Sequence, residues 1–169
     1  MKSPTSRLLI FGLGGMILLI LIIVIATLAL TPAQTNPAFA AAVSFVDAAA
    51  RGNDAAAQPY LSDALQTYVA ESCPSGSVSA CVEGYIPDEW GAFQSIVFRR
   101  ATPDGDGWHV DLIGTWELDR GFSGVCVYAN MQQEDDGQWR VQRWAGFAWC
   151  GDAGTRNMQT NPDAPNQTP

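Results

Sequence analysis

Few residues in this chain have both the type and the spacing that catalysis requires. His109 and Asp111 lie two positions apart in a stretch whose apolar residues repeat every second position, so both side chains belong on one face of a strand. A histidine–carboxylate pair can act as a general base. That face is the polar one, however, and spacing places no Ser or Cys nucleophile beside the pair. The pattern therefore favours a solvated surface pair, and we predict no catalytic residue.

Other reaction motifs are missing from the sequence. It contains no phosphate-binding glycine loop and no G-x-S-x-G nucleophile turn. The chain has one His, and the spacing of Cys73 and Cys81 fits no zinc-finger pattern. The aspartates at 104 and 106 stand in a glycine-rich turn without the later Glu of a calcium loop. The sequence therefore predicts neither a metal nor a cofactor.

Arg143 is the residue that most clearly breaks the expected alternation. Counted along its strand, it falls on the apolar face. It is either a long side chain that reaches the edge of the sheet or pairs with a helix carboxylate such as Asp47 or Asp63, or an anion-binding group at a cavity mouth. Trp108, Trp116 and Trp139 are predicted on the same face and could wall the space above the sheet. These four residues form the predicted ligand-binding set, for an amphipathic carboxylate.

Two aromatic residues break the pattern in the opposite sense. Tyr128 and Trp144 fall on the polar face of adjacent strands, opposite each other in the expected register. They either cover the sheet or form a contact surface for a protein partner or a second copy of the chain, because aromatic residues are enriched in interface cores.

The four cysteines are even in number, which in an exported domain indicates two disulfides. The Ser/Gly/Pro loop between Cys73 and Cys81 brings its ends together at small entropic cost, so this pairing is favoured. Cys126 and Cys150 remain by elimination. The expected hairpin register places Cys126 opposite Gly146, which leaves Cys150 too far away unless the chain bends.

An uncharged stretch at residues 8–30 predicts a membrane anchor. It has 23 residues, which as a helix reach about 34 Å. Lys2 and Arg7 precede it, and this bias predicts a cytoplasmic tail at 1–7 with the rest of the chain outside the cell membrane. A cleaved signal peptide is the rival interpretation, since residues 38–40 (AFA) resemble a cleavage site. The apolar run is too long and ends too early for that.

The charge of residues 31–169 excludes two classes of partner. This part carries 17 acidic residues and seven arginines without lysine, so its net charge is 7 − 17 = −10. Such a surface repels nucleic acid and anionic lipid. The membrane is therefore expected as a partner only through the N-terminal helix.

Helices are predicted in the first half of the extracytoplasmic part. After a linker at 31–36, Asn36 caps a helix that begins at Pro37 and ends near Arg51. A second helix starts at 53–54, is interrupted by Pro59 and resumes after Ser62. Residues 73–81 read as a loop, and 86–90 as one further helical turn.

The second half reads as strands joined by short turns. Connections this short force neighbouring strands to be antiparallel. The predicted strands are 93–102, 108–118, 122–133 and 138–148, in one domain at 37–152 that is followed by a disordered tail at 153–169. Helices followed by a four-stranded antiparallel sheet predict an α+β fold.

The order of elements resembles the nuclear transport factor 2-like superfamily, an α+β cone, and in particular its small membrane-anchored bacterial members of unassigned function. The resemblance rests on FVDAAARGND at 45–54, YLS at 60–62 and EDDGQWRV at 134–141, and it covers about 37–150. It implies a curved sheet closed by helices around a cavity. Enzymes of that superfamily place Asp, Tyr or His there, but fold alone does not give function.

Three functions are compatible with these observations. The first is a non-catalytic binding or assembly domain on a membrane anchor, an order of parts that type IV secretion systems also use. The second is a pocket for a small amphipathic anion. The third is an isomerase-like or hydrolase-like enzyme, which would need a buried acid–base pair that the sequence does not offer.

Overall fold

The computed structural model describes residues 4–29, 36–84, 86, 88–118 and 125–149. The expected C-terminal tail, 153–169, and most of the expected linker, 31–35, lie outside this part of the chain. Helix α1, Pro4–Ala29, has 26 residues, and its large apolar side chains between positions 16 and 25 are 49–62% exposed. Among the residues described, no helix combines the length and the apolar content that a membrane crossing requires.

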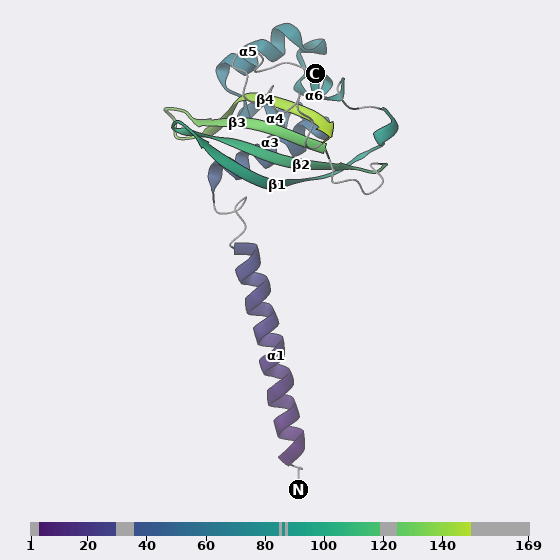
Figure 1. Ribbon diagram of the computed structural model, residues 1–169, viewed down its shortest axis with the longest axis vertical. Helices are drawn as coiled ribbons and strands as arrows, with labels where there is room; N and C mark the ends of the chain where they lie inside the picture. Colours follow the sequence, from purple (N-terminus) through teal and green to yellow (C-terminus); the bar gives the residue numbers. More distant parts are fainter. Residues whose placement is uncertain (1–3, 30–35, 85, 87, 119–124, 150–169) are drawn as a thin grey trace.

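The remaining elements follow the predicted order of helices first and strands second (Figure 1). The prediction of helices packed on a four-stranded antiparallel sheet is confirmed. The helical elements are α3 (Pro37–Ala50), α4 (Asp54–Ala57), η1 (Gln58–Tyr60), α5 (Asp63–Ser72), η2 (Pro74–Gly76), α6 (Val78–Glu83) and η3 (Asp88–Trp90). The strands are β1 (Phe93–Asp104), β2 (Gly107–Trp116), β3 (Val125–Gln133) and β4 (Trp139–Trp149).

Side-chain caps fix where the helices begin, as the sequence predicts. The Asn36 side chain accepts the Ala38 N–H at 2.9 Å at the start of α3, and Ser62 accepts the Leu65 N–H at 3.3 Å at the start of α5. At the other end of α3, Gly52 has a φ of +73°, a left-handed conformation that costs glycine little.

The loop predicted between the first two cysteines contains a helix, so that prediction is wrong. The side chain of Ser77 caps α6 by accepting the Ala80 N–H at 3.0 Å. The Asp54 carboxylate, from α4, accepts the Ser79 N–H at 2.8 Å. This second cap comes from 25 positions away, and local sequence gives no sign of it.

The disulfide between Cys73 and Cys81 is confirmed, with Cα atoms 5.1 Å apart. It joins the end of α5 to α6, and both residues are buried. Cys126 is also disulfide-bonded. Cys150, its expected partner, lies outside the described residues, so this pairing stays a prediction.

The sheet has the order β1-β2-β3-β4, and all neighbours are antiparallel. α3 packs against all four strands and covers one face of the sheet, here called the core face. Most residues that alternation places on the core face of β2 and β3 are buried: Val110, Leu112, Trp116, Val125, Val127, Ala129 and Met131. Leu118, predicted on the same face, is 51% exposed and follows the end of β2. Phe45 and Val46 of α3 are buried with them.

Strand β1 does not alternate regularly between the two faces of the sheet. Register shifts occur between Phe93 and Ser95 and again between Phe98 and Arg100. As a result Ile96 is buried and Phe93 and Phe98 pack against the core, although these residues do not follow one strict alternation. Val97 points away from the core and is exposed.

Candidate functional site

A bulge in β4 decides where the predicted site residues lie. Val141 pairs with Met131, but Arg143 pairs with Asn130, so Gln142 is an extra residue in the strand. Because side chains alternate, one extra residue exchanges the two faces of the residues that follow it, as far as a second register shift between Gly146 and Ala148. Arg143 was expected opposite Ala129 on the core face; it instead lies on the opposite face of the sheet, here called the second face.

The same bulge moves Trp144 in the opposite direction. It pairs with Ala129 on the core face, is 2% exposed, and its ring centroid lies 5.7 Å from that of Phe45. Tyr128 stays on the second face but is 1% exposed. The predicted aromatic pair on one exposed face is therefore wrong, because the two residues lie on different faces and both are buried.

The predicted ligand-binding set is not brought together. Trp108 contacts Phe39 of α3, with ring centroids 5.2 Å apart, and Trp139 lines a cavity near the β3–β4 turn. Trp116 packs against Trp90 with centroids 5.5 Å apart. All three tryptophans belong to the core face as predicted. Arg143 lies across the sheet from them, so the four residues do not form one site.

The second face carries a polar network centred on the Asp104 carboxylate. Asn130 Nδ2 donates to Asp104 Oδ2 at 2.8 Å, and His109 Nε2 lies 3.0 Å from the same oxygen. Arg143 Nη2 lies 3.9 Å from it. Three nitrogens thus converge on one carboxylate oxygen, and these contacts fix the position of the Asp104 side chain.

The network pairs His109 with a residue that sequence reasoning missed. Asp111, the expected partner, instead accepts a 2.5 Å hydrogen bond from Arg100 Nε. This hydrogen bond raises the pKa of Arg100 above its ordinary value. The expectation of a solvated His–Asp pair is wrong, since the Asp111 side chain is 5% exposed and that of His109 is 17% exposed. Asp104 pairs with Gly107 across the β1–β2 turn, and Thr102 pairs with His109. The register of the β1–β2 hairpin therefore brings Asp104 close to His109, and a prediction of this register would have identified the pair.

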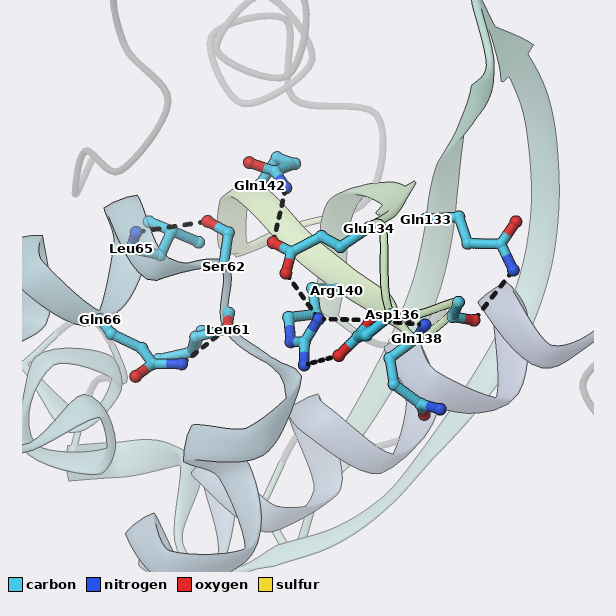
Figure 2. Close-up of polar contacts among 11 residues, drawn as sticks. Leu61, Ser62, Leu65, Gln66, Gln133, Glu134, Asp136, Gln138, Arg140 and Gln142 are labelled. Atoms are coloured by element: carbon cyan, nitrogen blue, oxygen red, sulfur yellow. Dashed lines mark hydrogen bonds and ion pairs between the residues drawn. The ribbon is translucent and has the colours of Figure 1, made fainter.

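A second polar network fixes the β3–β4 turn. Figure 2 shows the Arg140 side chain between two carboxylates: Nη1 donates to Glu134 at 2.5 Å and Nη2 to Asp136 at 2.6 Å. The hydrogen bond from Arg140 lowers the pKa of Asp136 below its ordinary value. Gln142, the bulged residue, donates to Glu134 at 3.5 Å. The Arg140 guanidinium is therefore engaged by protein carboxylates.

Two cavities lie beside α3, one near each end of the helix. The first, here called the α3–α6 cavity, has a volume of about 430 Å³ and lies among the end of α3, α6, η3 and the facing ends of β1 and β2. The second, here called the hairpin cavity, has a volume of about 590 Å³ and lies between the start of α3 and the β3–β4 turn, with Tyr60 and Trp139 in its lining. Both fall in the size range of small-molecule sites.

No family model, curated protein or solved structure matches this chain. Its function must therefore be argued from its own residues. Within the described part of the chain, no group of three or more His, Cys, Asp or Glu side chains is placed to hold a metal ion. Of the features above, the α3–α6 cavity offers the best candidate site, because its lining combines two aromatic rings, Phe93 and Trp116, with the carboxylates of Glu83 and Asp88.

One wall of this cavity depends on Asp54, which connects α4 to α6. Burial opposes ionisation of Asp54, but hydrogen bonds from Ser77 and Ser79 lower its pKa below the ordinary value. A lowered pKa in the folded state stabilises the fold above the ordinary carboxyl pKa, and this contribution is lost as the pH falls through the lowered value.

We therefore expect Asp54→Asn to reduce the free energy of unfolding by about 1 kcal/mol at neutral pH. The difference from the wild type should shrink as the pH falls through about 4 and vanish below the lowered pKa. Urea titrations across this pH range measure both effects. Asp106→Asn, in an exposed turn, is the matched control and should change stability by less than about 0.5 kcal/mol. A stability difference between the wild type and Asp54→Asn that stayed constant down to acid pH would contradict the role assigned to Asp54.

Proposed function

We propose that this protein is a membrane-anchored extracytoplasmic domain that binds or assembles with a partner and does not catalyse a reaction. The α3–α6 cavity is the proposed binding site. The observation that carries the proposal is the combination of an apolar N-terminal helix with an outer domain whose polar networks are satisfied internally while this cavity stays open.

Support for the anchor comes from sequence and exposure together. Residues 8–30 carry no charge, and as a helix these 23 residues would reach about 34 Å. The row of large apolar side chains from Met16 to Ile25 is exposed to its surroundings, a condition that water makes costly and hydrocarbon does not. The Lys2/Arg7 bias supports an N-terminus in the cytoplasm.

We also propose that the outer domain is a nuclear transport factor 2-like cone. Support comes from the succession of helices and an antiparallel meander, with α3 packed across one face of all four strands. In this proposal α3 closes the sheet, and the α3–α6 cavity is the open end of the cone.

Two observations favour binding over catalysis. His109 has its ring nitrogens near Asp104 and Asn130, and no Ser or Cys takes part in this network among the described residues. A general base must reach a substrate or water proton, and His109 lines neither of the two cavities described above. In addition, β1 is an edge strand, where a protein partner or a second copy of the chain could add a strand.

The topology predicts a definite cleavage pattern. Protease added to intact cells should remove the outer domain, and the membrane fraction should retain a small N-terminal fragment. The control is the same digestion after the membrane is permeabilised, which should also trim the cytoplasmic end. A mature protein that began at Ala41 and was found in the medium would contradict the anchor.

A further inference from the structure

The floor of the α3–α6 cavity is aromatic. Phe93 and Trp116 meet edge to face, with ring centroids 5.2 Å apart, and Trp90 also packs against the Trp116 indole. Trp116 is buried and both Val82 and Ile86 line the space beside it. Such a floor suits the apolar part of a ligand, because burying a ring or an alkyl chain releases water from both surfaces.

The one cationic side chain in the described lining is already engaged. Arg51 Nε lies 3.0 Å from both carboxylate oxygens of Asp47, and Nη2 donates to the Gln94 carbonyl at 3.1 Å. Its guanidinium carbon also lies 5.0 Å from the centroid of the Phe93 ring. Asp47 balances the charge of Arg51, so this side chain offers an incoming anion less attraction than an unpaired guanidinium would.

The carboxylates of the lining have no such partner. Glu83 and Asp88 both line the cavity, and neither takes part in a salt bridge among the residues described. Glu117 lies at the same end, with Oε2 3.4 Å from the place that a Cβ on Gly91 would occupy. The cavity mouth is therefore negative, and the net charge of −10 on residues 31–169 adds a long-range attraction for cations.

We propose that the α3–α6 cavity binds an organic ammonium ion with an apolar stem, with Glu83 and Asp88 as the counter-charges. The stem lies on the Phe93–Trp116 floor, and the ammonium group donates to the two carboxylates. The proposal rests on the binding function proposed above and specifies the class of ligand. It reverses the sign of the ligand that Arg143 suggested from sequence, because Arg143 lies on the second face of the sheet.

The test compares two probes that share a stem and differ in charge. Phenethylamine and 3-phenylpropionate are titrated by calorimetry into the full chain in phosphatidylcholine nanodiscs, with empty nanodiscs as the blank. We expect the amine to bind and the carboxylate not to bind. Binding of the amine should weaken as sodium chloride is added, since salt screens the carboxylates. An acetylated Phe-Lys amide forms a further arm: tighter binding than phenethylamine would identify a lysine side chain as the source of the ammonium.

Matched variants locate the site. Glu83→Gln combined with Asp88→Asn should lower the affinity for phenethylamine at least tenfold. Glu71→Gln combined with Asp106→Asn removes the same charge from exposed positions and should change it less than twofold. Tighter binding of 3-phenylpropionate, an equal loss in both double variants, or no binding of either probe would overturn the proposal. None of these results bears on the protease pattern that tests the anchor, so the two failures are distinguishable.

Discussion

Replacing Trp144 by alanine is expected to lower the free energy of unfolding by about 3–5 kcal/mol. The indole is 2% exposed and packs against Phe45 beneath α3, so its removal leaves a large cavity in the core. Equilibrium unfolding in guanidinium chloride measures the loss. The size of the effect depends on the bulge at Gln142, because without the extra residue Trp144 would lie on the second face.

The neighbouring residue provides the control. Arg143→Ala removes a side chain that lies 3.9 Å from Asp104 and is 24% exposed, so it should cost less than about 1 kcal/mol. A strand without the bulge requires the reverse order, with Arg143 buried and Trp144 dispensable. Equal losses, or a larger loss for Arg143→Ala, would therefore show that the register of β4 is wrong.

Removing the first disulfide is expected to have the second largest effect. Cys73→Ala combined with Cys81→Ala should lower the free energy of unfolding by about 2–3 kcal/mol, as closing a short loop in the unfolded chain implies. Both residues are buried where α5 meets α6, so the substitution also loosens the helix that carries Glu83. Urea titrations of the oxidised proteins measure the difference.

Reduction tests whether this difference comes from the bond itself. In excess dithiothreitol the wild type and the double variant both lack the Cys73–Cys81 bond, and their stabilities should converge. Because Cys126 is reduced in both, its own disulfide drops out of the comparison. A difference that persisted under reduction would assign the loss to packing of the sulfur atoms.

Local signals predicted the start of the helices and the order of the strands. Asn36 and Ser62 cap helices through their own neighbours, and Gly137 closes the β3–β4 turn with a φ of +80°, all features of a few consecutive residues. The helix α6 was missed because one of its caps is Asp54, whose contact with Ser79 forms only when α4 and α6 meet.

The sequence indicated the bulge only indirectly, through two residues that strict alternation puts on unfavourable faces. Strict alternation buried Arg143 and exposed Trp144, and both placements are unfavourable. A single extra residue corrects both at once, yet alternation cannot show where in the strand that residue sits. The candidate site could not be predicted from the sequence for a different reason. Its lining comes from α3, α6, η3, β1 and β2, and these segments come together only in the complete fold.

Gly114 in β2 is not among the residues that line the α3–α6 cavity, yet it determines how much space the cavity has. A Cβ on Gly114 would lie 2.5 and 2.8 Å from Cζ3 and Cη2 of the Trp116 indole, so the ring occupies the space of the missing side chain. Any larger residue at 114 would displace the ring, and the cavity is the adjoining empty space that the indole lines. Related proteins could therefore gain or lose a binding site through one codon, while every lining residue stayed the same.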